Sequence, residues 1–145
     1  MPDLAGTKTH ENLKKAFTES ASTHLRYLYF AHAADNEGLP EVGDLFRKMA
    51  QNETGHSHGH LDFLREVGDP ETGLPMGETN LNLRNAAVME TTNKAEEYKR
   101  MAESAREDEF LEVSNWFATL ARIARAQAKR LEQMSFTLNQ GEKAG

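Results

Sequence analysis

The sequence contains no cysteine. Disulfides, thiolate nucleophiles, zinc ribbons and cysteine-held iron–sulfur clusters are therefore excluded, and any metal must bind nitrogen and oxygen ligands. No apolar run approaches the roughly 18 to 20 residues needed to cross a bilayer. Residues 1–6 have neither the basic region nor the apolar core of a signal peptide. We therefore expect a soluble, cytoplasmic protein without a membrane partner.

The sequence has fewer basic than acidic side chains. Lys and Arg together number 17 against 23 Asp and Glu, which gives a formal net charge of −6. This charge repels the phosphate backbone of nucleic acids and anionic lipid instead of attracting them. Nucleic acid is therefore not an expected partner. The 145 residues have the length of one domain with one hydrophobic core.

Apolar residues recur at three- and four-residue spacing in four long segments, which is the pattern of helices with one buried stripe. No segment alternates with the period of a strand. Gly38 ends the first segment and Pro40 begins the second. The turn residues of 68–79 predict the one long loop. The expected helices cover about residues 10–37, 40–67, 80–106 and 108–139.

The two halves of the chain look like copies of one helical hairpin. An offset of about 70 residues aligns residues 12–14 (Asn-Leu-Lys) with 82–84 (Asn-Leu-Arg), and after one inserted residue 41–42 align with 112–113 (both Glu-Val). Two hairpins joined by a longer crossover form a four-helix bundle, which commonly holds metal sites in its core. The sequence therefore predicts an all-α, antiparallel four-helix bundle. As a single domain over residues 1–145, it would comprise hairpin one at about 10–67, a crossover loop at about 68–79 and hairpin two at about 80–139.

Polar side chains interrupt the apolar stripe of each predicted helix. Burying an unpaired carboxylate is costly, so such residues need a metal ion, a counter-charge or a hydrogen-bonded network. Glu53 and His56 form a Glu-x-x-His motif, whose spacing points both groups at one spot near the bundle axis. Chance also produces this spacing in many helices. The inward-facing polar residues are Ser20, His24, Glu53, His56, His60, Glu90, Asn93, Glu97 and Gln127.

Three stretches of the chain resemble the rubrerythrins, in particular the short members without a C-terminal rubredoxin module. They are residues 12–17 (NLKKAF), 26–31 (RYLYFA) and 53–64 (ETGHSHGHLDFL). The resemblance covers nearly the whole chain. It implies a ferritin-like fold with two irons that reduce hydrogen peroxide. The implied ligands are inward carboxylates on the first and third helices and a Glu-x-x-His motif on the second and fourth.

Three of the seven ligands that the resemblance implies are present. Glu53 and His56 match the motif of the second helix, and Glu90 matches a carboxylate of the third. The other implied positions hold Ser20, Asn93, Ala124 and Gln127. A carboxylate-bridged pair of irons needs about four carboxylates. The resemblance thus implies iron, while the residues leave a single metal ion, or none, as the alternatives to a di-iron pair.

His24 is the fourth candidate ligand. It lies one turn beyond Ser20 on the same stripe, and in an antiparallel hairpin it should lie near the level of Met49 to Glu53. Together with Glu53, His56 and Glu90 it could form a mononuclear site. Two histidines and carboxylates suit iron, manganese, zinc or copper.

Three functions remain open from the sequence. The resemblance implies a peroxide-reducing oxidoreductase that is a homodimer and uses an external electron donor. The missing ligands instead favour a metal-poor structural or regulatory partner, which could form a hetero-dimer with an intact rubrerythrin. Exchange of hairpins between chains would allow such a mixed site. The third hypothesis is a protein that binds copper or a small molecule. Its ligand would lie in the core, in the space left where Ser20 and Ala124 stand in place of larger glutamates.

Overall fold

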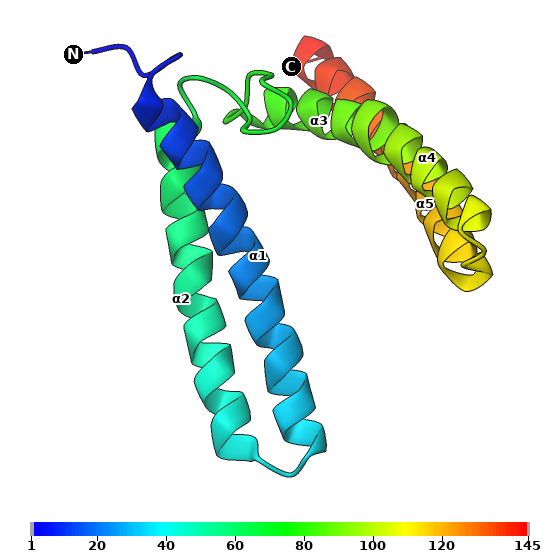
Figure 1. Ribbon diagram of the computed structural model, residues 1–145. Coiled ribbons are helices and arrows are strands. Elements are labelled where there is room, and N and C mark those ends of the chain that lie inside the picture. Colours follow the sequence, from blue (N-terminus) through cyan, green and yellow to red (C-terminus); the bar gives the residue numbers. More distant parts are fainter. Residues whose placement is uncertain (1, 145) are drawn as a thin grey trace. The chain divides into compact units, whose positions relative to one another are not determined.

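The computed structural model describes residues 2–144, with side chains to residue 141, and this part of the chain contains helices, turns and one longer loop but no strand. The chain divides into two compact units, Met1–Gly73 and Leu74–Gly145. In each unit two long helical segments run antiparallel, side by side (Figure 1). The prediction of an all-α protein is confirmed. None of the described helices has the length and apolar character of a membrane span.

Hairpin one consists of α1 (Lys8–Asn36) and α2 (Pro40–Leu64). The hydroxyl of Thr7 caps α1 by accepting a hydrogen bond from the backbone N–H of His10 at 3.1 Å. Gly38 turns the chain with a φ of +77°, and Pro40 is the first residue of α2. The α2 helix ends earlier than predicted, because the N–H groups of both Val67 and Gly68 donate to the Leu64 carbonyl in a closing turn.

Hairpin two pairs one long helical segment with α5 (Leu111–Ala144). The long segment runs without a break through α3 (Thr79–Val88), η1 (Met89–Ala95) and α4 (Glu96–Glu107). A single helix was predicted here, but η1 is a π-helix. Hydrogen bonds in a π-helix run from residue i to i+5, so the segment holds one residue more than an α-helix would.

The π-helix accounts for the inserted residue in the internal repeat. Before it, Leu13 and Leu83 are 70 residues apart. After it, the offset is 71: Tyr27 lies against Phe46 and Tyr98 against Phe117, with ring centroids 5.9 and 6.0 Å apart. The two aromatic pairs are therefore equivalent contacts. The change of offset falls between residues 83 and 98, the interval that contains η1.

Small residues form the seam between the two helices of each hairpin. They recur every seven residues, as in antiparallel coiled coils, and small side chains allow the helices to approach closely. The buried seam residues are Gly43, Ala50 and Ser57 in α2, and Ser114, Ala121 and Ala128 in α5.

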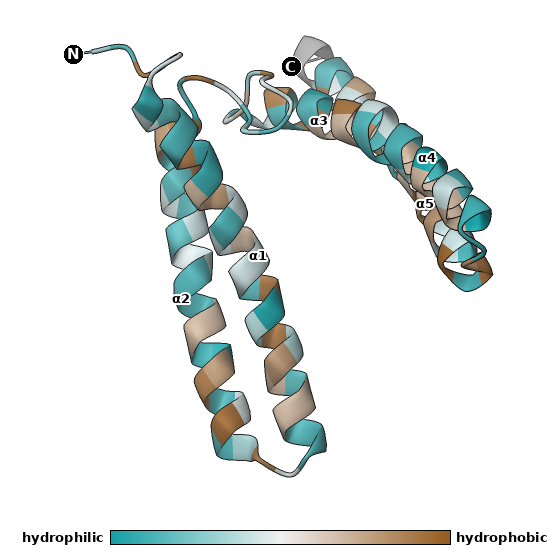
Figure 2. Cartoon of the chain, viewed as in Figure 1, coloured by the Kyte–Doolittle hydropathy of each residue, from teal (hydrophilic) through white to brown (hydrophobic). Residues whose placement is uncertain are grey.

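Large apolar side chains lie mostly outside these seams. Leu64 is the largest of the fully buried side chains described, whereas Phe30, Leu45, Trp116 and Ile123 are exposed. Apolar residues of hairpin one gather toward the turn between α1 and α2 (Figure 2). Each hairpin thus leaves apolar surface of the kind that usually marks an interaction site.

Candidate metal centre

Glu53 and His56 lie one turn apart on α2. Oε2 of Glu53 is 3.5 Å from Nδ1 of His56. The Glu53 side chain is 23% exposed and that of His56 is 62% exposed. Two donors that each lie about 2.1 Å from one ion can be at most about 4.2 Å apart. The pair therefore has the spacing of two ligands to the same metal ion, as the Glu-x-x-His motif predicts.

His24 packs against α2 at the level that the sequence predicts. Its Nδ1 lies 2.8 Å from the carbonyl oxygen of Ala50 and 3.1 Å from Oγ1 of Thr54. A carbonyl oxygen only accepts, so Nδ1 carries a proton and, in a neutral ring, Nε2 holds the lone pair. Histidine ligands of metals are commonly oriented in this way. Nε2 is therefore the atom through which His24 can bind a metal.

The groove beside His24 does not include the other candidate ligands. It measures about 300 Å³ and is lined by Phe17, Ala21, His24, Leu25, Thr54, Ser57, His58 and Leu61. Neither Glu53 nor His56 contributes to it. Over the described residues 2–141, no three His, Asp or Glu side chains come together as a ligand group.

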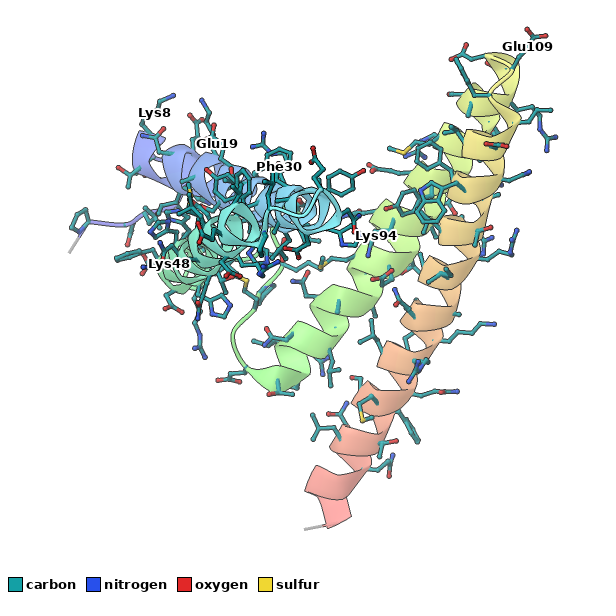
Figure 3. The ribbon with its side chains drawn as sticks, turned by 90° about the horizontal axis from the view of Figure 1, so that it is seen from below. Lys8, Glu19, Phe30, Lys48, Lys94 and Glu109 are labelled. Atoms are coloured by element: carbon teal, nitrogen blue, oxygen red, sulfur yellow. The ribbon has the colours of Figure 1, made fainter. Side chains whose placement is uncertain are left out.

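Ser20 lies in the seam of hairpin one, where the resemblance implies a carboxylate. Its hydroxyl donates to the carbonyl of Ala16 at 2.9 Å, one turn earlier in α1. The neighbouring Glu19, labelled in Figure 3, is exposed. Hairpin one therefore supplies the Glu53–His56 pair without a carboxylate at residue 20.

Glu90 is the second residue of η1, and its side chain is 13% exposed. Oε1 lies 3.0 Å from Nζ of Lys94. Oε2 is buried and has no hydrogen-bond partner in the structure. A buried acceptor without a partner carries its full desolvation cost, roughly 1 to 3 kcal/mol and more for a charged group. This oxygen is therefore available to a cation or a donor, while the other oxygen is already paired.

Hairpin two does not repeat the Glu53–His56 pair. At the equivalent positions, 71 residues later, stand Ala124 and Gln127. Gln127 lines a groove of about 470 Å³ together with Glu90 and Arg130. One carboxylate, an amide and a guanidinium do not neutralise a divalent cation. The residues of hairpin one thus fit part of a metal site, but those of hairpin two do not fit a second metal ion.

Lys94 and the π-helix were not assigned any role from the sequence. The change of repeat offset from 70 to 71 is the signal that could have located the π-helix. A lysine four residues after Glu90 also predicts an ion pair, because residues i and i+4 lie on the same face of a helix.

Comparison with known proteins agrees with the helical fold. The Rubrerythrin family model matches residues 11–134. Rubrerythrin-1 of Clostridium acetobutylicum is 31% identical over 138 residues, which cover 90% of this chain and 71% of that protein. The rubrerythrin of Clostridium perfringens is 30% identical over 150 residues, covering 98% and 77% of the two chains.

A third relative extends the match to another genus. The rubrerythrin of Nitratidesulfovibrio vulgaris is 30% identical over 146 residues, covering 97% of this chain and 76% of that protein. No rubredoxin module is evident in the cysteine-free sequence. The repeated helical hairpins, the Glu-x-x-His motif and these matches place the chain in the rubrerythrin family, with its ferritin-like helical fold.

Proposed function

We propose that this protein is a rubrerythrin-type oxidoreductase that reduces hydrogen peroxide at a single metal ion, as part of a defence against oxidative stress. Family membership supports a metal-binding oxidoreductase, with iron as the metal. The observation that carries the proposal is the 3.5 Å approach of the Glu53 carboxylate to the His56 imidazole. The i, i+3 spacing of this pair is what a metal needs from one helix.

Four side chains are candidate ligands in this proposal. Glu53 and His56 bind the metal from α2. Nε2 of His24 is the candidate donor from α1. Glu90 of hairpin two is a candidate by its match to the third-helix carboxylate of the family pattern, and its Oε2 has no hydrogen-bond partner.

The reaction needs electrons from outside the chain. Reducing hydrogen peroxide to two water molecules breaks the O–O bond and takes up two electrons and two protons. Bound iron would supply the transfer of electrons to peroxide. Because the sequence has no cysteine to hold a rubredoxin-type centre, a separate electron donor must supply them.

Anaerobic reconstitution with Fe²⁺ tests the proposal. The expected result is about one iron per chain, together with peroxide consumption when an external reductant is present. The double variant Glu53→Gln/His56→Ala should lose both. A matched control is Asp62→Asn/His32→Ala, which changes an exposed carboxylate and an exposed imidazole of the same hairpin. Far less than one iron per wild-type chain, or equal iron in both double variants, would defeat the proposal.

The exposed apolar surfaces favour one alternative. Each hairpin packs its own helices through small residues and leaves large side chains such as Leu45 and Trp116 exposed. A hairpin of an intact rubrerythrin could cover such a surface and add the ligands that hairpin two lacks. This chain would then be a structural or regulatory partner. Co-expression should yield a mixed dimer that binds more metal than this chain alone, and absence of any mixed species would exclude this role.

A further inference from the structure

A groove of about 700 Å³ runs between α4 and α5 of hairpin two, which lie side by side (Figure 1). Its volume is within the range of small-molecule sites. Basic side chains outnumber carboxylates in its lining. The basic residues are Lys99, Arg106, Arg122 and Arg125, and the acidic ones are Glu103 and Glu107. The groove is therefore a cationic site in a protein whose formal net charge is −6.

The basic side chains of this groove are not neutralised by the protein. Among the residues that the structure describes, none of the four forms an ion pair with a carboxylate. Glu103 lies four residues after Lys99 and three before Arg106 on α4, a spacing that permits ion pairs, yet it forms neither. The four positive charges are therefore available to an anion from outside the chain.

The equivalent surface of hairpin one is covered by an internal ion cluster. Nη1 of Arg47 lies 2.7 Å from Oδ2 of Asp35, and Nη2 lies 2.7 Å from Oδ1 of Asp44. The carboxylate of Asp35 lies so close to the seam residue Gly43 that a Cβ there would collide with it. Hairpin one thus pairs its charges at this place within itself, and the missing side chain of glycine provides the space.

Hairpin two has no such cluster at the equivalent positions. At 71 residues later in the chain, Arg106 stands in place of Asp35 and Ala118 in place of Arg47. The first exchange reverses the charge, and the second removes a long side chain from the groove. The other three basic residues also have no basic equivalent in hairpin one, where the residues are Leu28, Gln51 and Thr54. All four positive charges are therefore particular to hairpin two, and so is the open space at Ala118.

The groove is on the opposite side of hairpin two from the exposed apolar residues. Lys99 lines this groove, whereas Met101, Val113 and Phe117 line a separate groove that shares no residue with it. Two residues correspond to a rotation of about 200° around a helix, so Lys99 and Met101 point in opposite directions. A partner that covers the apolar surface of the hairpin therefore leaves the cationic groove open.

We propose that this groove binds a small molecule that carries a chain of phosphate groups. The planar guanidinium of arginine can donate to two phosphate oxygens at once. Lys99 and Arg106 are separated by roughly 10 Å along the axis of α4, a distance that a chain of phosphates spans better than a single phosphate. Arg122 adds a third cation from α5. The excess of basic over acidic groups suits a ligand with at least two negative charges.

Isothermal titration calorimetry of the full chain with tripolyphosphate, ATP and citrate tests this assignment. Tripolyphosphate and ATP share the phosphate chain, so each should bind at one molecule per chain, and added salt should weaken both. Citrate carries several negative charges on carboxylates and should bind at least tenfold more weakly. No saturable binding of tripolyphosphate at millimolar concentration, or an equal affinity for citrate, would overturn the assignment.

Three variants distinguish this groove from a diffuse positive charge. Arg106→Gln removes one cation of the groove and should weaken tripolyphosphate binding roughly tenfold. The matched control is Arg100→Gln, which removes an exposed arginine of α4 outside the groove and should leave the affinity unchanged. Ala118→Leu keeps every charge but fills the groove, so it should also weaken binding at least tenfold. Equal weakening by the two arginine variants, or full affinity in Ala118→Leu, would contradict a specific site.

A further measurement uses the wild-type protein and depends on no variant. In two-dimensional NMR spectra, tripolyphosphate should shift the backbone amide signals of residues 99–107 and 114–125. The signals around the Arg47 cluster of hairpin one should stay unchanged, because its charges are already paired. Shifts of similar size in both hairpins would overturn the site. Since all the lining residues belong to hairpin two, these results do not depend on a metal at Glu53 and His56.

Discussion

Glu109 occupies in hairpin two the position that Gly38 occupies in hairpin one. The two residues are 71 positions apart, and both have positive φ, +67° for Glu109 and +77° for Gly38. Their N–H groups make equivalent bonds, from Gly38 to the carbonyl of Asp35 at 3.1 Å and from Glu109 to that of Arg106 at 3.0 Å. The same left-handed turn is therefore built once with glycine and once with glutamate, and Figure 3 labels this glutamate, Glu109.

Replacing Glu109 with glycine should stabilise the protein. A side chain in the left-handed region costs roughly 1 to 2 kcal/mol, and the extra freedom of glycine in the unfolded chain offsets part of the gain. We expect Glu109→Gly to raise the free energy of unfolding by about 0.5 to 1 kcal/mol. Urea denaturation measures this change in the free energy of unfolding. Gly38→Ala is the matched control and should have the opposite effect, and a lower urea midpoint for Glu109→Gly would contradict the argument.

Ser114 bonds its own helix to the preceding one. Its hydroxyl donates to the carbonyl of Ala102 at 2.7 Å in a buried position of the seam. Ser114→Ala keeps the Cβ and removes this bond, so it should lower the free energy of unfolding by about 1 kcal/mol. Ser104→Ala changes an exposed serine of α4 and should be neutral. Equal urea midpoints for the two variants would show that the buried hydrogen bond contributes nothing.

Asp35 should make the stability of the protein depend on pH. Arg47 donates to both Asp35 oxygens, at 2.7 and 3.3 Å, and these hydrogen bonds hold the pKa of Asp35 below its ordinary value of 3.8. The folded state therefore binds the proton less well than the unfolded state. The stabilisation is present above about pH 4 and is lost as the pH falls through the lowered pKa.

Comparison of wild type with Asp35→Asn measures this contribution. Wild type should have the higher urea midpoint at pH 7, and the two midpoints should converge as the pH is lowered from about 4 toward 2. Because both partners are exposed, added salt should narrow the difference at pH 7. Asp62→Asn is the control at an exposed aspartate of α2. A difference that stays constant down to pH 2 would rule out this ion pair as its source.

The sequence predicted the features that follow from helical periodicity. The apolar stripes located the four long helical segments, and the spacing of Glu53 and His56 predicted their approach. The position of His24 along the hairpin was also predicted, because antiparallel packing of α1 and α2 on either side of the turn at Gly38 brings it beside Ala50. These predictions need only the geometry of one helix or one hairpin.

Features that depend on hydrogen-bond choice were not predictable. A stretch of seven residues can form a π-helix or an α-helix with the same composition, and the repeat showed only that one residue is inserted between two matched stretches. The early end of α2 depends on two N–H groups that share the Leu64 carbonyl. The proton on Nδ1 of His24 likewise follows from its contact with Ala50, which the sequence does not specify.

Deleting Thr92 should convert η1 into a regular α-helix. Thr92 is exposed, and hairpin one is α-helical through the corresponding turn with one residue fewer. The flanking α3 and α4 can therefore keep their packing on α5. We expect the free energy of unfolding to rise by on the order of 1 kcal/mol, the contribution of about one regained backbone hydrogen bond.

The effect of deleting Thr92 should be specific to the π-helix. Deletion of Glu103, an exposed residue of α4, is the control. It would rotate one part of a regular helix by about 100° against the other and disrupt packing on both sides. If both deletions destabilise the protein equally, the π-helix does not mark the inserted residue.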